Sequence, residues 1–374
     1  MNFCATDIAW INDRWEKVNN KLLEVSVRSR EKLPYYSENG VHVSKHEQPD
    51  WWTNGFWGGM MWLMYNATGN EEYKITAKRC EQLLSGAFGN ISALHHDVGF
   101  MWHITSGARC RLMGDKDAEN TELFMASLLS SRFVLGGNFI RAWNTEKSEN
   151  LTIIDTLMNV PMLYFASELV GDDRYKRIAM AHVDMVMRDH VREDGSTVHI
   201  VEHDRETGKK IREVAGQGYA DNSCWSRGLS WAVYGFALSY IHTGKKEYLD
   251  TAVKCADYFI SECGKTGYVP LLDFKAPKEP VYYDSTAGVI TACGLIEISK
   301  ILSDSKYFTA AMRVLKETDE KCCDYTESTD SIVGMGSVRY PHKENNAVHI
   351  PIIYGDFYFV EALCKLLGKD FLIW

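Results

Sequence analysis

The sequence of 374 residues predicts an all-α fold, an (α/α)6 barrel in which six helical hairpins form one closed toroid. Two observations lead to this prediction. A short signature recurs along the chain, and helical segments that are apolar all round alternate with amphipathic ones. We expect one domain over residues 1–374, because a helical toroid can bury a chain of this length around a single core.

The recurring signature places Gly, Tyr and Ala four residues apart. The complete copies are Gly69, Tyr73 and Ala77; Gly171, Tyr175 and Ala179; and Gly244, Tyr248 and Ala252. A degenerate copy is Ser303, Tyr307 and Ala311, and a weaker one is Gly114 with Ala118. A glycine that ends one helix, followed by a tight turn and a helix with Tyr and Ala on one face, explains this spacing. Each copy therefore predicts a helical hairpin.

Apolar periodicity predicts twelve helices in chain order. They cover residues 5–30, 54–67, 71–87, 98–113, 117–135, 155–169, 173–191, 223–242, 246–263, 285–301, 305–320 and 355–367. Segments before the Gly turns are apolar nearly all round and are expected inside, whereas those after carry Lys, Arg and Glu and are expected outside. The closed barrel is favoured over an open right-handed solenoid of the same hairpins.

One non-helical element is also predicted. Residues 196–201 alternate like a strand, and residues 204–210 resemble a turn that follows it. This segment is expected to form a hairpin in a loop.

Composition excludes several classes of partner and compartment. The net charge of −9 and the absence of any Lys/Arg run argue against nucleic acid or an anionic membrane as partner. The first residues lack a basic region followed by an apolar stretch, and no run of about 18 apolar residues occurs, so we expect a soluble, cytoplasmic protein. Ten scattered cysteines without C-x-x-C or zinc spacing are expected to be reduced thiols.

Unusual residues gather in the loops that lead into the inner helices, and these loops must lie at the rim opposite the Gly turns. They cover residues 50–57, 95–100, 153–159, 217–228, 283–288 and 354–358. Convergence of this kind predicts a binding cleft. Asp284, Asp356 and Asn222 could equally be simple helix caps.

Tryptophan indicates the class of ligand. Several of the eleven tryptophans lie in the rim loops, and indole stacks well on the apolar C–H faces of sugar rings. Trp52, Trp143 and Trp225 are predicted to line the cleft. Trp57 and Trp62 lie within an apolar helix and are predicted to be core residues.

Two aspartates are the candidate catalytic groups. Asp155 is flanked by Ile153, Ile154 and Leu157, and this apolar setting favours a protonated carboxyl, as a general acid requires. The position of Asp155 at a helix start favours the anion instead, so the net shift of its pKa stays open. Asp97 precedes Gly99, which could let a substrate approach the backbone.

At these residues the sequence resembles glycoside hydrolase family 88, the unsaturated glucuronyl hydrolases. The motifs in order are W-T-x-G-F-W at 52–57, H-H-D-x-G-F at 95–100, I-I-D-x-L-x-N at 153–159, Q-G-Y-x-D-x-S-x-W-x-R-G-x-x-W at 217–231, D-S-T-A at 284–287 and Y-G-D-F-Y-F-x-E-A-L at 354–363. The resemblance spans nearly the whole chain. It implies the same barrel, no metal or cofactor, and action on the 4,5-unsaturated uronic acid that polysaccharide lyases leave at a nonreducing end.

The resemblance also implies residue roles. Asp155 would protonate C4 of the enol ether, water would add at C5, and the resulting hemiketal would open and release the remaining sugar. Asp97 would orient the sugar and keep Asp155 in its working protonation state. The residues that would hold the uronate ring of a di- or oligosaccharide are His199, Gln217, Arg227 and Trp231, and His96 is a further candidate for substrate binding.

One departure concerns sulfate. Family members that prefer sulfated disaccharides carry Arg just before the Gln, whereas Gly216 precedes Gln217 here. Ser337, Arg339, Tyr340 and Lys343 nevertheless offer a possible anion site near the C-terminus.

Other functions remain open at this point. An unsaturated rhamnogalacturonyl hydrolase would share the fold and the chemistry. A sugar 2-epimerase would recruit His95 or His96, which would leave the two aspartates without a role. A non-enzymatic helical scaffold would not concentrate Trp, Asp, His and Arg at one rim.

Overall fold

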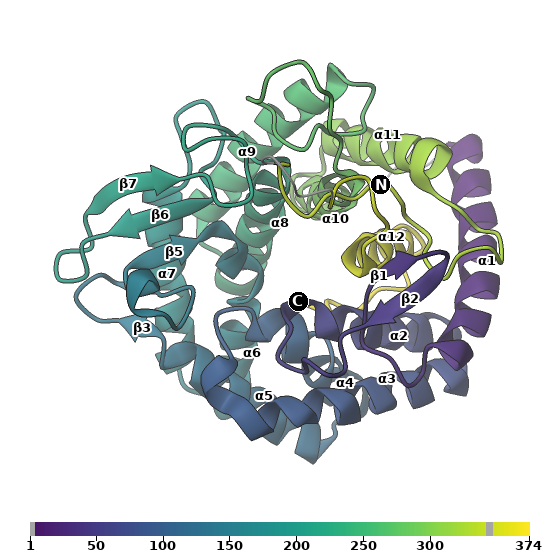
Figure 1. The fold of residues 1–374 in the computed structure, drawn as a ribbon, viewed down its shortest axis with the longest axis horizontal. Coiled ribbons are helices and arrows are strands. Elements are labelled where there is room, and N and C mark those ends of the chain that lie inside the picture. The colour runs from purple at the N-terminus through teal and green to yellow at the C-terminus, as the bar shows by residue number, and fades with distance from the viewer. Residues whose placement is uncertain (1–3, 342–346) are drawn as a thin grey trace.

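The computed structural model describes residues 4–341 and 347–374 and is an (α/α)6 barrel, with two concentric rings of helices (Figure 1). Within these residues the inner ring contains α2 (Gly55–Thr68), α4 (Ser106–Met113), α6 (Pro161–Val170), α8 (Ser226–Thr243), α10 (Ser285–Leu302) and α12 (Ile353–Leu366). The outer ring contains α1 (Ala5–Arg28), α3 (Glu71–Leu84), α5 (Lys116–Ser130), α7 (Arg174–Asp189), α9 (Lys246–Gly264) and α11 (Ser305–Cys322). All twelve predicted helices are present.

Left-handed residues end α2, α4, α6, α8 and α10 at one rim, whereas Leu367, which follows α12, has a right-handed conformation. Gly69, Gly114, Gly171 and Gly244 all adopt positive φ angles directly after α2, α4, α6 and α8. Ser303 takes the same conformation after α10, with a φ angle of 56°. The degenerate copy of the signature is therefore a genuine helix end of the same kind.

The inner helices form the core, as their apolar sequences predict. In α2, residues 55–64 are all buried, and they include Trp57 and Trp62. α10 has the length and mean hydropathy of a membrane span, but 83% of it is buried inside the barrel. Its apolar character therefore reflects a position in the core of the toroid.

The ends of the chain close the ring. α12 packs against α10 on one side and α2 on the other, and α1 packs outside it, so the sixth hairpin is formed by the two terminal helices. This contact excludes the open solenoid. After α12 the chain turns back into the barrel, and the side chain of Trp374 is completely buried.

Three small sheets lie at the rim opposite the Gly turns. Their strands are β1 (Pro34–Glu38), β2 (Val41–Ser44), β3 (Phe133–Val134), β4 (Phe139–Ile140), β5 (Leu151–Ile153), β6 (Ile200–His203) and β7 (Lys210–Val214). β6 and β7 are the predicted hairpin, but β6 begins four residues later than expected. Residues 196–199 instead lead into the site as an irregular segment.

Two predicted helices are interrupted at their beginnings. Residues 99–103 form a π-helical turn before α4, and residues 154–158 form a 3-10 turn before α6. Both irregular turns directly follow or contain a candidate catalytic aspartate. Such departures from α-helical geometry are frequent at functional sites, and periodicity alone does not reveal them.

Candidate active site

The candidate residues lie on the segments that precede the inner helices. Trp52 precedes α2, Asp97 precedes α4, Asp155 precedes α6, Trp225 is the N-cap of α8 and Asp284 is the N-cap of α10. Because all inner helices run in the same direction, these segments share one rim. The predicted convergence is therefore a consequence of the barrel's topology.

The three-stranded sheet aligns three of the candidates. β6 pairs with both β5 and β7, and Ile153, Ile200 and Val214 lie side by side in this register. Asp155 follows β5 by two residues, His199 directly precedes β6, and Gln217 follows β7 by three. All three consequently leave the sheet at the same end.

Asn159 connects the two candidate acids. Its Nδ2 donates to Asp97 Oδ1 at 3.4 Å and to the Asp155 carbonyl oxygen at 3.2 Å. Its Oδ1 accepts the backbone N–H of Phe100 at 2.8 Å. A Cβ atom on Gly99 would lie 2.7 Å from the Asn159 Cα, so Gly99 is needed for this close approach, and the access for a substrate at Gly99 stays a prediction.

Asp97 and Asp155 are both buried, at 8% and 7% exposure. Burial raises the pKa of Asp97 well above its ordinary value, and the neighbouring Asp155 carboxylate raises it further. The pair therefore tends to retain a proton. The sequence had left the protonation of Asp155 open and had made no statement about the pKa of Asp97, which the structure shows to be raised.

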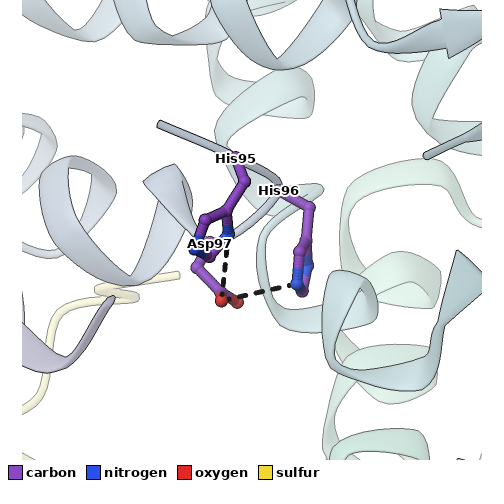
Figure 2. A group of neighbouring side chains, drawn as sticks. All are labelled: His95, His96 and Asp97. Carbon is purple, nitrogen blue, oxygen red and sulfur yellow. Dashed lines mark ion pairs between the residues drawn. The ribbon is translucent and has the colours of Figure 1, made fainter. Parts of the chain in front are cut away.

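Two histidines face the Asp97 carboxylate (Figure 2). His95 Nδ1 and His96 Nε2 each lie 3.4 Å from Asp97 Oδ2. Burial lowers the pKa of His95 to about 4 and lowers that of His96 well below its ordinary value, so both rings are neutral near pH 7. They surround Asp97 with polar groups without supplying positive charge.

The same three side chains could hold a metal ion by their chemistry. Their donor atoms lie within 4.8 Å of one another, and two imidazoles with one carboxylate suit a divalent transition metal. His96 also contacts the Thr156 hydroxyl through Nδ1 at 3.0 Å, which leaves Nε2 directed at Asp97. No step of the chemistry that the resemblance implies requires a metal, and the metal-free site stays a prediction.

Arg227 is buried and strongly bonded. Its Nη1 donates to Asp284 Oδ2 at 2.5 Å and to the Ser337 carbonyl at 2.5 Å, and Nη2 donates to the Val338 carbonyl at 2.7 Å. The guanidinium also lies 4.5 Å from the Trp225 ring centroid. Arg227 therefore fastens the segment around residues 337–338 to α8 and α10 in addition to any contact with a ligand.

The predicted aromatic residues surround the acids at different depths. Trp52 and Trp143 are half-buried, whereas Trp225 and Trp231 are buried. The Trp143 ring lies 6.0 Å from His96, and the Trp225 ring lies 4.3 Å from His199. The indole nitrogens of Trp225 and Trp231 are buried and have no hydrogen-bond partner within the described part of the chain.

The remaining candidates support one another. Gln217 donates its side-chain amide to the Val338 carbonyl at 2.6 Å, and its own carbonyl accepts the Tyr340 N–H at 2.8 Å. The Ser337 hydroxyl is buried and bonds the Tyr283 carbonyl and the His349 N–H. The anion site suggested for Ser337 thus has its hydroxyl engaged within the protein, and Lys343 lies outside the described residues.

Sequence reasoning missed three supporting residues, which are Asn159, Asp284 as the partner of Arg227, and Tyr354. The Tyr354 ring lies 5.4 Å from Trp52 and 5.2 Å from the Arg227 guanidinium. Asn159 could have been found from its position four residues after Asp155, one helical turn away. The Arg227–Asp284 pair spans 57 positions and left no local signal.

Asp356 has a structural role. Its Oδ1 accepts the backbone N–H groups of Ile332 and Val333, at 3.0 and 2.7 Å. This carboxylate ties α12 to the segment at residues 332–333, and within residues 4–341 and 347–374 it makes no hydrogen bond or ion pair with Asp97 or Asp155. The helix-cap interpretation of Asp356 is therefore wrong, because Ile352 is the N-cap of α12 and Asp356 lies within the helix, where it bonds a neighbouring segment.

Comparison with known proteins agrees with this geometry. The model of Glycosyl Hydrolase Family 88 matches residues 25–241. The unsaturated glucuronyl hydrolase of Bacillus sp. (strain GL1) is 32% identical over 367 residues, which cover 94% of this chain and 96% of the relative. The unsaturated chondroitin disaccharide hydrolase of Streptococcus pneumoniae (strain ATCC BAA-255 / R6) is 31% identical, over 86% of this chain and 83% of the relative.

Solved structures give the same result. The crystal structure of the Bacillus sp. GL1 enzyme has a TM-score of 0.87 with 32% identity, and it covers 94% of this chain and 96% of its own. A mutant of the unsaturated glucuronyl hydrolase of Streptococcus agalactiae, complexed with dGlcA-GalNAc6S, has a TM-score of 0.83 with 26% identity, over 100% of this chain and 95% of its own. The chain belongs to glycoside hydrolase family 88 and is a glycoside hydrolase of the unsaturated glucuronyl hydrolase type.

Proposed function

We propose that this enzyme removes the 4,5-unsaturated uronic acid from the nonreducing end of glycosaminoglycan oligosaccharides produced by lyases. The observation that carries the proposal is the buried pair Asp97 and Asp155, in which Asn159 bonds the carboxylate of Asp97 and the backbone carbonyl of Asp155. The ligand of the S. agalactiae mutant begins with dGlcA and supports a substrate of this class.

The proposed reaction needs one acid that becomes a base. Asp155 gives its proton to C4 of the C4=C5 double bond, water adds at C5, and the water proton returns to Asp155. The hemiketal at C5 then opens to a ketone, and the hemiacetal left at C1 releases the remaining sugar as an alcohol. Atoms balance with one water consumed, and Asp155 ends in its starting state.

Asp97 supports this cycle from beside Asp155. Burial and the neighbouring Asp155 carboxyl raise the pKa of Asp97, which disfavours two negative charges at the site, and the reaction requires that Asp155 hold the proton when C4 is attacked. Asn159 holds the Asp97 carboxyl against the backbone of Asp155. His199 and the indole nitrogens of Trp225 and Trp231 provide polar contacts for the uronate ring.

The test follows the ultraviolet absorbance of the conjugated enol ether. Wild-type enzyme, Asp155→Asn and the control Asp356→Asn are mixed separately with disaccharides from chondroitin, heparin and rhamnogalacturonan lyases. We expect wild type and Asp356→Asn to bleach a glycosaminoglycan disaccharide, and Asp155→Asn to fail, because an amide cannot supply the proton. In D₂O, early product should carry deuterium at C4.

Other results would redirect the proposal. Bleaching of the rhamnogalacturonan product alone would assign the enzyme to that substrate class. Equal rates for Asp155→Asn and wild type would remove Asp155 from the mechanism.

We also propose that the enzyme works in the cytoplasm. All ten cysteines are free thiols in the structure, which fits a reducing compartment. Recovery of the native protein in a periplasmic or secreted fraction of its source cells would contradict this location.

A further inference from the structure

The loop after β7 closes tightly on the ring of His199. The backbone N–H of Gln217 donates to His199 Nδ1 at 2.9 Å, and the Ala215 carbonyl oxygen lies 3.2 Å from the same nitrogen. Gly216 lies between them with a φ angle of +60°. A Cβ atom at this position would lie 2.2 Å from His199 Nδ1, so the approach requires glycine.

These contacts define which ring nitrogen carries the proton. The Gln217 N–H always bears its hydrogen, and that hydrogen points at Nδ1, which must therefore offer a lone pair. In the neutral ring the proton consequently lies on Nε2. The Ala215 carbonyl could accept only from a protonated Nδ1, and then the Gln217 N–H would face a second hydrogen.

The opposite side of the ring faces the catalytic acid. His199 Nε2 lies 3.4 Å from Asp155 Oδ1, and neither atom has a hydrogen-bond partner within residues 4–341 and 347–374. The Trp225 ring, 4.3 Å away, packs on the imidazole and restricts its rotation. The Nε2–H group is therefore held as a fixed donor beside Asp155.

We propose that Gly216 is a positioning residue that acts through His199. Its left-handed backbone places the Gln217 N–H on Nδ1, which holds His199 as the Nε2–H tautomer, a donor that cannot accept the proton of Asp155. The inference rests on the proposed function, because it takes Asp155 as the acid. Gly216 stands where sulfate-preferring family members carry Arg, and this proposal gives it a role unrelated to sulfate.

The direct test is ¹⁵N NMR of histidine-labelled protein, with the His199 signals identified by their loss in His199→Asn. In wild type, we expect Nδ1 to show the chemical shift of an unprotonated nitrogen and Nε2 that of a protonated one. The opposite tautomer in wild type would overturn the proposal. This readout needs no substrate, so it remains decisive if the proposed substrates fail.

Variants then connect the tautomer to activity. Gly216→Ala must move the ring or the loop by roughly 1 Å, and a displacement of that size can lower kcat by about 100-fold. We expect that loss together with a mixed or switched tautomer. Gln217→Ala keeps the backbone N–H and should keep the wild-type tautomer, although it loses the amide contact with Val338.

Gly69→Ala is the matched control for backbone strain. Gly69 has a φ angle of +71°, and a Cβ atom there meets nothing within 4 Å, so only the strain of a left-handed residue is added, at the rim far from the acids. It should keep both the tautomer and kcat. A Gly216→Ala variant with wild-type tautomer and wild-type kcat would overturn the proposal.

Discussion

Replacing Arg227 by Met should destabilise the fold by leaving Asp284 buried without its cationic partner. Asp284 has no exposed surface, and its Oδ2 accepts from Arg227 at 2.5 Å. Removing one partner of a buried ion pair costs roughly 3–5 kcal/mol. The lower end is expected here, because Asp284 Oδ1 still accepts from Thr286 and from the Ser337 N–H.

The expected change in melting temperature follows from the chain length. An unfolding entropy of about 2.1 cal/mol/K per residue gives roughly 0.8 kcal/mol/K for 374 residues. A loss of about 3–5 kcal/mol therefore lowers Tm by roughly 4–6 °C, measured by circular dichroism at fixed pH. Arg227→Lys keeps the charge but not the planar fork, and should lower Tm by about half as much.

A double variant isolates the buried charge. Adding Asp284→Asn to Arg227→Met removes the unpaired carboxylate, so part of the lost stability should return. Two results would refute this reasoning. One is a Tm for Arg227→Met within about 1 °C of wild type. The other is a double variant whose loss equals the sum of the two single losses.

Two further predictions concern stability away from the acids. Burial raises the pKa of Glu122 to about 8, so between about pH 4.5 and 8 the folded protein keeps a proton that the unfolded chain has released. The free energy of unfolding should fall as pH rises through that window, by at most about 1.4 kcal/mol per pH unit, and urea unfolding should show a smaller slope in Glu122→Gln. If the pH slope in Glu122→Gln equals that of wild type, Glu122 is instead ionised in the folded protein and paired with His103 or Arg111. Trp374→Ala should cost roughly 3–5 kcal/mol, because its indole is fully buried, while kcat below the melting range stays near wild type. A Tm within about 1 °C of wild type would contradict that prediction.

The sequence was sufficient for the helices because their signals are local. The Gly turns and the alternation of apolar and amphipathic segments occur within single hairpins, and all twelve helices were predicted, although α4 and α6 begin at Ser106 and Pro161 and not at residues 98 and 155. The strands β1 to β5 were missed, since two- to five-residue strands carry too little periodicity. The turns at 99–103 and 154–158 were missed because tertiary packing determines them.

The residues of the site could be predicted from the sequence, but the contacts between them could not. The resemblance implied roles for Asp97, Asp155, His199 and Arg227, and the structure brings Asp155 within reach of His199. The partnership of Arg227 with Asp284 and the closure of Gly216 on His199 depend on contacts between separate loops. The protonation environment of the two acids likewise depends on their mutual position, which no local pattern records.

The buried C-terminal tryptophan determines how an elongated molecule can use the barrel. Ring contacts run without interruption from Trp374 to Tyr358, Trp231, Phe100 and Trp52, so aromatic side chains fill the axis from the Gly-turn rim to the acids. Among the described residues, this packing closes the Gly-turn end of the toroid, so the barrel there is a cup and not a channel. A polymer can present only its tip to such a cup, and the detached unit must leave by the mouth through which it came before the next tip arrives.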